Sequence, residues 1–507
     1  TNRLNIYVIQ KANVGFAKYI ASLPEGKERG VAIGYDNRHM SYKFAIESAK
    51  VLATYGIKSY IFESLRPTPE LSFAVRYLKC AGGIMITASH NPKEHNGYKV
   101  YDDTGCQLLP EAADQVVQYV NEVEDELNIK VFSDEEAYPY MTWIGEEVDE
   151  AYYKEVMAIE VNPGMDKSDF KIVFSPQHGT SNIAVRTCLT RLGYDLVPVL
   201  AQCAPDPDFS NTKSPNPEVP ASYELAIKKA KEVDADVVVI TDPDGDRLGV
   251  VAKHNGEYVL MSGNQSAAVY LEYILSQMKE KGTLPDNAVM YNTIVTSDLG
   301  ELVARSYGVD VEKTLTGFKF IGDKIRKYEQ THEKTFVFGY EESYGCVIKD
   351  FVRDKDAVQA VLTAAEAGNF YKKQGKDLVD VLNELYAKHG TFKETQIALS
   401  KAGAAGAARI KEIMDNLRKD APQEIGGVKV VKVEDYGNST CSDGTTIQLP
   451  KSNVLKYYLE DGSWIAARPS GTEPKCKFYF SIKGSDADDA ASKTEVFHKA
   501  MMEIIGE

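Results

Sequence analysis

Hydrophobic and polar positions follow a repeated order along this chain: a short β-branched run, a polar loop, and then a stretch with helical periodicity. Clear examples are "GVAIGYDNRHMS" near residue 30, "FKIVFSPQHGTSN" near 170 and "AVMYNTIVTSDLG" near 288. Strand, loop and helix repeated in this way predict α/β layers built on mostly parallel sheets. Because ligands collect at the carboxyl ends of strands in such sheets, we expect the functional residues in these loops.

The pattern changes after about His389. An Ala-rich stretch with helical periodicity, residues 400–419, precedes pairs of strand-like runs and a terminal helix around "KTEVFHKAMMEII". These features predict a separate, smaller C-terminal α+β domain after three α/β domains. A chain of 507 residues is too long for one hydrophobic core. We place the four domains at residues 1–155, 156–262, 263–388 and 389–507.

Composition excludes several functional classes. The formal net charge of −16 argues against a general nucleic-acid binder, so any anionic ligand must be bound by a local basic pocket. No apolar run approaches the ~20 residues that cross a bilayer, so no membrane partner is expected. The seven cysteines are scattered without CxxC spacing, and the chain opens without a secretory signal pattern. These features predict reduced thiols and a cytoplasmic location; the oligomeric state is left open.

An acidic loop follows the apolar run in "DVVVITDPDGDRLGVVA". Asp242, Asp244 and Asp246 lie so close together that a hard divalent cation among them is the easiest way to keep all three ionised. An EF-hand loop is excluded, because counting from Asp242 its required Gly and Glu positions hold Arg247 and Lys253. The oxygen ligands favour a catalytic Mg²⁺ with open positions. The alternative is a solvated acidic turn.

Two further loops hold groups suited to a phosphorylated sugar. In "ARPSGTEPKCKFYF" an Arg fork, two hydroxyls, a Gly-permitted backbone and a Lys suit a phosphate dianion: Arg468, Ser470, Gly471, Thr472 and Lys475. A simple Pro/Gly turn between strands is the alternative. In "FVFGYEESYG" a strand ends at Glu341, Glu342 and Ser343, whose groups bind sugar hydroxyls. An acid-rich helix N-terminus explains the same residues equally well.

A serine interrupts the strand-like stretch "ITASHNPKEHNGYKVY". Ser89 is followed by His90, Lys93, His95 and Lys99, so cations surround a single hydroxyl. A hydrolase nucleophile is disfavoured, because no G-x-S-x-G elbow is present. The other alternative is a serine that only closes a turn or caps a helix.

Together these loops resemble those of the α-D-phosphohexomutases, specifically the long phosphoglucomutase-type branch. The matching motifs are "TASHNP", "DPDGDR", "EESYG" and "RPSGTEPK", in the family's order, together with "GYDNRHMS", "RPTPEL", "LTGFKFIG" and "RDKDAV". The resemblance implies three α/β domains of similar topology and a smaller C-terminal domain around a central cleft. It also implies an enzyme that moves phosphate between O1 and O6 of a hexose, with glucose 1,6-bisphosphate as activator.

The resemblance assigns roles to particular residues. Ser89 would carry the phosphoryl group, and the Mg²⁺ held by the three Asp side chains would also bind an oxygen on it. Arg247 would neutralise charge in phosphoryl transfer. Lys99 is the first choice for the acid/base group and His90 the second, but a Lys base requires a lowered pKa.

Substrate contacts are expected from residues in three segments, which are Thr316, Gly317, Lys319, Glu341, Ser343, Arg353 and Lys355; for Arg353 and Lys355 a solvated basic face is the alternative. The "TGFKF" motif favours glucose phosphates over mannose phosphates. A phosphopentomutase, a phosphomannomutase or a bisphosphate synthase is the alternative on this fold. There are two departures from the family pattern. Cys346-Val347 stand where many relatives have Gly-His, and the sequence begins after the point where the family's Gly-rich loop stands, so either the sequence is clipped there or the polypeptide is impaired. The second departure raises the alternative of a catalytically silent sugar-phosphate-binding protein.

Overall fold

A computed structural model of the chain describes residues 4–470 and 474–507. The chain divides into two compact units. Unit 1 comprises residues 1–292, 307–312 and 317–381, and unit 2 comprises residues 293–306, 313–316 and 382–507. Each unit is described by itself.

Three sheets share one strand order. In each, the third strand along the chain lies between the first strand and an antiparallel strand that follows the third in the sequence. The first sheet has the order β4-β3-β1-β2-β5, the second β10-β9-β8-β6-β7, and the third, mostly within unit 1, β12-β11-β13-β14. The strands are β1 Val31–Tyr35, β2 Ser59–Phe62, β3 Gly82–Ile86, β4 Tyr98–Tyr101, β5 Met141–Ile144, β6 Lys171–Ser175, β7 Asp195–Pro198, β8 Val237–Thr241, β9 Leu248–His254, β10 Glu257–Met261, β11 Ala288–Thr293, β12 Asp310–Thr314, β13 Thr335–Tyr340 and β14 Cys346–Val347. The predicted α/β domains of similar topology are therefore confirmed.

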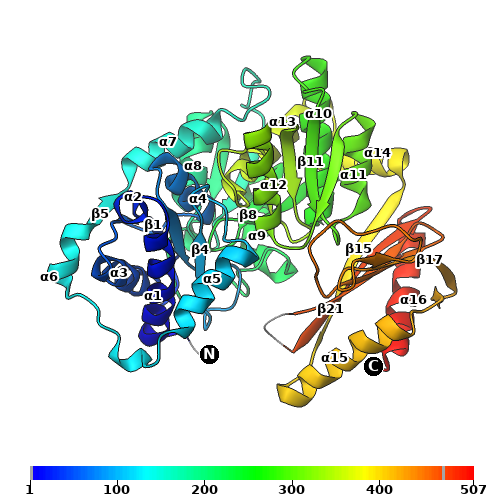
Figure 1. Cartoon of the computed structure of the whole chain (residues 1–507). Coiled ribbons are helices and arrows are strands. Elements are labelled where there is room, and N and C mark those ends of the chain that lie inside the picture. The colour runs from blue at the N-terminus through cyan, green and yellow to red at the C-terminus, as the bar shows by residue number, and fades with distance from the viewer. Residues whose placement is uncertain (1–3, 471–473) are drawn as a thin grey trace. The chain divides into compact units, whose positions relative to one another are not determined.

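Helices flank these sheets, which explains why the central strands read as continuous apolar runs rather than as alternating ones. They are α1 Ile6–Ser22, α2 Gly26–Arg29, α3 Ser41–Thr54, α4 Thr68–Tyr77, α5 Pro110–Asn121, α6 Asp134–Ala137, α7 Glu146–Met157, α8 Asn182–Arg191, α9 Glu224–Val233, α10 Gly263–Glu280, α12 Phe318–Thr331 and α13 Ala357–Lys372. On the first sheet, Phe16 of α1, Phe44 of α3 and Val116 of α5 pack with Ile33 of β1 in one core (Figure 1).

The strand order places three loops at equivalent positions. Residues 87–97 join β3 to β4, residues 242–247 join β8 to β9, and residues 341–345 join β13 to β14. In each case the loop follows a strand that runs parallel to the first strand and leads into an antiparallel neighbour. The loops that contain Ser89, Asp242 and Glu341 therefore occupy the same position in three sheets.

Unit 2 contains an antiparallel sheet with the path β15-β21-β20-β19-β17-β16, in which β18 also pairs with β17. Its elements are α11 Asp298–Ser306, α14 Leu378–His389, β15 Thr391–Ser400, α15 Gly403–Lys419, β16 Glu424–Ile425, β17 Val428–Asp435, β18 Thr440–Cys441, β19 Leu455–Leu459, β20 Trp464–Pro469, β21 Lys475–Gly484 and α16 Ala487–Ile505, the first residues of α14 belonging to unit 1. Apolar side chains of α15 and α16 share a core with β19, β20 and β21, so the predicted α+β domain is confirmed (Figure 1).

A buried lysine joins residues 293–306 to this sheet within unit 2. The Lys456 ammonium group donates to the Ile294 carbonyl at 2.8 Å and lies 3.9 Å from the centre of the Trp464 ring. The Trp464 indole in turn donates to Asp298 Oδ2 at 3.1 Å. One cation therefore bridges two segments that are far apart in the sequence.

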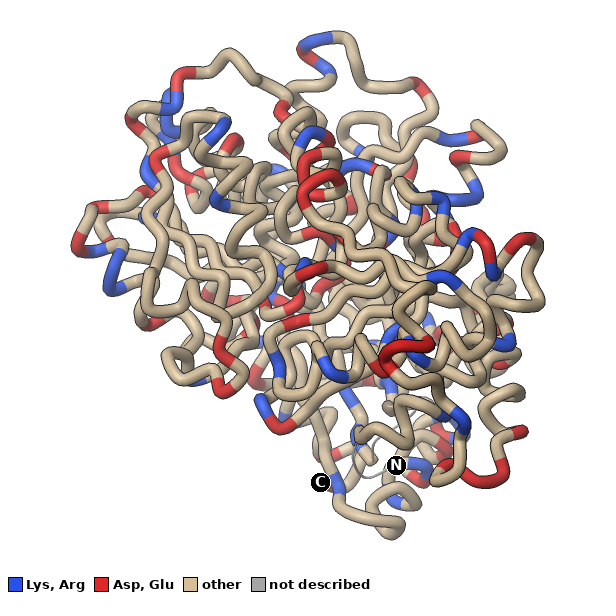
Figure 2. The backbone as a smooth tube through the Cα atoms, turned by 90° about the vertical axis from the view of Figure 1, so that its left-hand side faces the viewer, with Lys and Arg blue, Asp and Glu red and all other residues tan. Residues whose placement is uncertain are grey.

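Charged residues of both signs are interspersed along the backbone, and no long stretch of one sign stands out (Figure 2). All seven cysteines are free thiols. Among the helices of residues 4–470 and 474–507, none is long and apolar enough to cross a membrane.

We expect Gly249→Ala to destabilise the second sheet. A Cβ at this position would lie 1.9 Å from the Tyr223 hydroxyl oxygen, and that hydroxyl donates to the Pro217 carbonyl at 2.6 Å. Overpacking of this kind lowers the free energy of unfolding by about 1–3 kcal/mol. Urea unfolding would measure it, with Gly164→Ala as the matched control, because a Cβ there meets no atom within 4 Å. Equal unfolding midpoints for the two variants would contradict the prediction.

We expect Lys456→Met to weaken the rise of the stability of unit 2 with pH. Burial, followed by repulsion from Lys313, lowers the pKa of Lys456 to about 7. Between about pH 7 and 10 the unfolded chain therefore binds an additional proton, so this lysine makes stability rise with pH. For each pH unit, the free energy of unfolding of the variant should rise by about 1.4 kcal/mol less than that of the wild type. Urea unfolding at pH 7, 8 and 9 would test this, and parallel curves for the two proteins would refute it.

Candidate active site

Three buried carboxylates form the centre of the candidate site. Asp242, Asp244 and Asp246 follow β8, are at most 1% exposed, and have carboxylate oxygens within 4.8 Å of one another. Gly245 between them has φ +70°, a conformation that favours glycine. Asp242 Oδ1 accepts from the backbone N–H groups of Asp246 and Arg247, each at 3.0 Å. The loop is therefore wrapped around its own carboxylates and is not a solvated acidic turn.

Cations from other segments contact these carboxylates. Lys99 Nζ on β4 lies 2.9 Å from Asp244 Oδ2 and 3.7 Å from Asp246 Oδ2, and Lys355 Nζ lies 3.0 Å from Asp246 Oδ2. Burial, together with the charges of its two neighbours, raises the pKa of Asp242 well above its usual range. For Asp244, burial is outweighed by Lys99, by a hydrogen bond with Asp242 and by Lys355, so the pKa is lowered.

The arrangement fits a divalent cation. One oxygen of Asp244 and one of Asp246, the Oδ1 atom in each case, are buried and accept no hydrogen bond from the residues that the structure describes. Unpaired buried carboxylate oxygens are costly unless a cation satisfies them. The oxygen-only donor set is the one that Mg²⁺ prefers.

Ser89, which the resemblance implies as the phosphoryl carrier, lies against this triad. Its hydroxyl donates to Asp242 Oδ2 at 2.9 Å, and its Oγ is 3.3 Å from His90 Nδ1. The backbone of Ser89 is left-handed, with φ 52°, and its N–H group donates to Thr87 Oγ1 at 2.8 Å. A non-glycine residue in this conformation is a local strain that the surrounding structure must support.

The two proposed acid/base groups differ in their surroundings. Burial alone would lower the pKa of Lys99, but Asp244 and Asp246 outweigh burial and raise it. The lowered pKa that a Lys base requires is therefore absent while these carboxylates carry their charges. His90 contacts the Ser89 hydroxyl directly, so its role as the second candidate stays a prediction.

Other predicted residues lie close to this centre. Arg247 pairs with Glu218 at 2.7 Å, and the carboxylate of Glu341, which is 6% exposed, accepts from the Gly317 N–H at 2.8 Å. Glu341 lies in the loop between β13 and β14, so the helix N-terminus alternative does not apply. Lys355 is only 12% exposed and does not belong to a solvated face.

In the described part of the chain, three predicted substrate residues make neither a hydrogen bond nor an ion pair with the acidic loop. Arg353 is completely buried, pairs with Glu329 at 2.6 Å, and donates its backbone N–H to Ser72 Oγ at 2.9 Å. Lys319 and Ser343 are half-buried. For Arg353 the solvated-face alternative does not apply, because the side chain is paired inside the protein; its substrate contact stays a prediction.

The predicted phosphate loop joins β20 to β21 in unit 2. The Arg468 guanidinium reaches the Tyr479 hydroxyl at 3.5 Å, and the Ser470 N–H donates to the Lys475 carbonyl at 2.7 Å. Gly471 and Thr472 lie outside the described residues. Thr316 also falls in unit 2, and its buried hydroxyl accepts or donates no hydrogen bond among the residues described.

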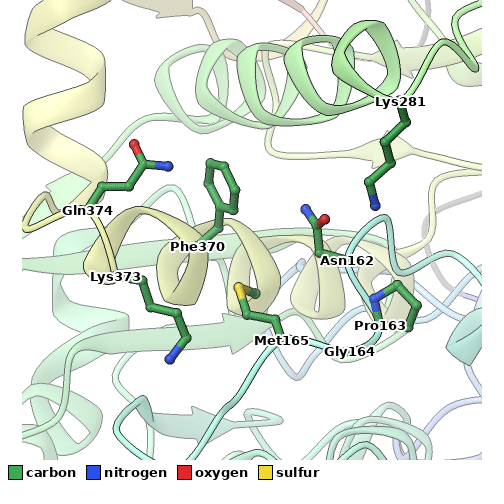
Figure 3. A pocket seen from close by; sticks show the side chains of 8 residues that line it. All are labelled: Asn162, Pro163, Gly164, Met165, Lys281, Phe370, Lys373 and Gln374. Atoms are coloured by element: carbon green, nitrogen blue, oxygen red, sulfur yellow. The ribbon is translucent and has the colours of Figure 1, made fainter.

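A separate cavity of about 440 Å³ lies beside α10 and α13 (Figure 3). Lys281 and Lys373 lie on opposite sides of it, with Phe370 and Asn162 between them. None of the residues singled out in the sequence lines this cavity, so it is not the candidate active site.

Comparison with known proteins agrees with this geometry. Four family models match in order: phosphoglucomutase/phosphomannomutase α/β/α domain I at residues 1–127, domain II at 150–256, domain III at 262–389, and the C-terminal domain at 407–499. The chain belongs to the phosphoglucomutase/phosphomannomutase family. It is therefore a phosphohexomutase-type isomerase, and the predicted family and enzyme class are confirmed. The domain boundaries given above stay predictions.

One relative supports the same class, and two solved structures show the same fold. A phosphoglucomutase of Staphylococcus epidermidis is 39% identical over 499 residues, covering 97% of this chain and 89% of the relative. A phosphoglucomutase/phosphomannomutase family protein from Burkholderia thailandensis shares the fold with a TM-score of 0.72 at 19% identity, over 99% of this chain and 94% of that one. The Aspergillus fumigatus N-acetylphosphoglucosamine mutase, solved with GlcNAc-6P and magnesium, has a TM-score of 0.53 at 14% identity over 87% and 92% of the two chains.

The sequence reasoning missed two residues of this candidate site. Thr68 donates its hydroxyl to Asp244 Oδ2 at 3.0 Å and its backbone N–H to the Asp244 carbonyl at 2.8 Å. Glu218 is the partner of Arg247. Thr68 stands in the motif "RPTPEL", where a hydroxyl at the start of a helix could have marked it as a site residue. No feature of the sequence around Glu218 could have marked it.

We expect Asp244→Asn to remove Mg²⁺ binding and turnover while the fold is kept. The amide keeps the shape of the side chain but lacks the charge, so the loss of affinity should exceed the roughly 100-fold that a change in an outer-shell partner costs. Isothermal titration with Mg²⁺ would measure it. Asp380→Asn is the control, because Asp380 belongs to a separate group with His254 and Asp377. Unchanged Mg²⁺ affinity in Asp244→Asn would rule out the triad as the metal site.

Proposed function

We propose that this enzyme interconverts α-D-glucose 1-phosphate and glucose 6-phosphate through a phosphoserine at Ser89 and a glucose 1,6-bisphosphate intermediate. The observation that carries the proposal is the 2.9 Å contact between the Ser89 hydroxyl and Asp242 of the buried triad. A nucleophilic oxygen held beside a cation site is what reversible phosphoryl transfer requires.

The proposed reaction has two balanced transfers. In the first, the bond between phosphorus and Ser89 Oγ breaks, a bond forms to the free hydroxyl oxygen of the sugar phosphate, and that hydroxyl gives up its proton. In the second, the reoriented bisphosphate donates its other phosphoryl group to Ser89 Oγ, and the sugar oxygen that leaves takes a proton. Glucose 1,6-bisphosphate therefore also phosphorylates an enzyme that lacks the group.

The chain's own cations are placed to stabilise this transfer. Lys99, Lys355 and Arg247 surround the acidic loop and can neutralise charge on the phosphoryl oxygens. Asp242, Asp244 and Asp246 would hold Mg²⁺, which when bound supplies Lewis-acid charge stabilisation. His90, 3.3 Å from Ser89 Oγ, and Lys99 are the candidates for moving the proton.

Two groups of residues are proposed to orient the sugar. Glu341 and Ser343 would bind hydroxyls, supported by the burial of Glu341 and its bond to the Gly317 N–H of the "TGFKF" segment. Arg468, Ser470 and Lys475, with Gly471 and Thr472, would bind a phosphate of the substrate. Binding of groups remote from the reaction centre fixes the reacting end. The name of the relative at 39% identity supports glucose phosphates as the substrates.

We expect the wild-type chain, with Mg²⁺ and a trace of glucose 1,6-bisphosphate, to convert glucose 1-phosphate in preference to mannose 1-phosphate and ribose 1-phosphate. Phosphorus NMR would follow each sugar separately. Faster conversion of mannose or ribose phosphate would replace the proposed substrate, and no conversion at all would contradict the proposal.

The phosphoserine is tested on the same protein by intact-mass measurement after exposure to glucose 1,6-bisphosphate. Ser89→Ala should take up no phosphoryl group and lose at least about 10³-fold in turnover, because the nucleophile is gone. Ser168→Ala, at an exposed serine, should behave as wild type. A phosphorylated Ser89→Ala chain would place the carrier elsewhere.

A further inference from the structure

An arginine outside the predicted site makes the densest set of contacts with the serine loop. Arg38 follows β1, and its side chain is completely buried. Its guanidinium Nε donates to Asp36 Oδ2 at 3.0 Å. The four other N–H bonds point at backbone carbonyls of residues 89–95. These are Ser89 at 2.6 Å, Asn91 at 2.6 Å, Pro92 at 2.8 Å and His95 at 3.0 Å. All five donors of the guanidinium are therefore used.

These contacts supply hydrogen-bond donors to the backbone carbonyls of the serine loop. Residues 89–95 form neither helix nor strand, so their carbonyls have no ladder partners. Residues 91–95 are themselves exposed, but the four carbonyls that contact Arg38 face a completely buried guanidinium, and a carbonyl that faces the interior needs a donor. A planar guanidinium can serve several of them at fixed angles, whereas the three donors of an ammonium group cannot. Arg38 thus sets the curvature of the loop and supports the left-handed backbone of Ser89.

Neighbouring groups hold Arg38 in turn. The Asp36 carboxylate, which is 2% exposed, also accepts from the Arg38 N–H at 3.0 Å and from Ser41 Oγ at 2.6 Å. Ser41 Oγ accepts from the Asn96 amide at 2.9 Å, which ties the far end of the serine loop to the same turn. The Phe209 ring lies 5.2 Å from the guanidinium carbon.

The alternative role for a cation at this position is direct binding of the phosphoryl group. It is disfavoured, because the charge of Arg38 is neutralised by Asp36 and no N–H bond is left over for a ligand. We propose that Arg38 is the positioning residue of the phosphoserine loop: it fixes the backbone of residues 89–95 so that Ser89 Oγ faces Asp242. This inference rests on the proposed function of Ser89.

Arg38→Lys tests the proposal, because it keeps the charge beside Asp36 but removes the fork. We expect kcat to fall about 10- to 100-fold while KM for glucose 1-phosphate changes less than about threefold, since the loop presents the nucleophile rather than binding the sugar. Phosphorylation of Ser89 by glucose 1,6-bisphosphate should slow to a similar extent. Mg²⁺ affinity should stay within about twofold, because the three Asp side chains are unchanged.

The matched control is Arg29→Lys. Arg29 also joins a carboxylate, Asp103, to two backbone carbonyls, those of Lys79 and Cys80, but contacts no residue of the serine loop. Its kcat should equal that of wild type. Hydrogen exchange followed by mass spectrometry gives a second readout. Arg38→Lys should expose amides 87–97 and leave those of β8 protected, whereas the control should change neither.

A second variant covers the outcome in which Arg38→Lys does not fold. Asp36→Asn with Arg38→Met removes both buried charges together and keeps an acceptor for Ser41, so no unpaired charge is left inside. The same local loss of protection and the same fall in kcat are expected. A folded variant of either kind with wild-type kcat, or with wild-type exchange in 87–97, would overturn the proposal. The exchange readout does not depend on catalysis, so it still tests Arg38 if the wild type proves inactive and the proposed function fails.

Discussion

Repulsion among three buried carboxylates is the constraint around which unit 1 is organised. Asp242, Asp244 and Asp246 stand in one short loop, yet the groups that offset their charge come from β4, from the start of α4 and from the segment after β14. Three segments far apart in the sequence therefore depend on one another. The loop of one sheet is completed only when its neighbours are folded.

Arg38 is a second buried charge, of the opposite sign, that likewise depends on partners from other segments. Arg38 is neutralised by one carboxylate and solvated by carbonyl oxygens, so the protein replaces water around it with a loop. Under the proposed function, the triad would set the position of the phosphoryl group, and Arg38 would fix the backbone that carries it. Because both sets of charges are buried, the loss of a partner would leave a charge that neither water nor the protein stabilises.

Much of this could be predicted from the sequence, because strand, loop and helix alternate visibly and the functional loops follow apolar runs. The triad and Ser89 were singled out in this way, since carboxylates and a lone serine at strand ends are unusual, and the structure brings them together; the role of Ser89 came from the family resemblance and stays a prediction. The environment of Arg353 was not, because a basic residue in a loop gives no sign of whether it meets solvent or Glu329. The raised pKa of Lys99 and the partner role of Glu218 also depend on tertiary neighbours that no local pattern encodes.

The repeated strand order has a consequence for how such proteins diversify. Each functional loop joins two hydrogen-bonded antiparallel neighbours, so its two ends are held about 5 Å apart by the ladder whatever lies between them. Insertions or exchanges within a loop are therefore absorbed at small entropic cost and leave the sheet intact. A change in the length of one loop therefore leaves the strands that carry the other two in place, but the contact between Ser89 and Asp242 ties the serine loop to the acidic loop, so these two must change together.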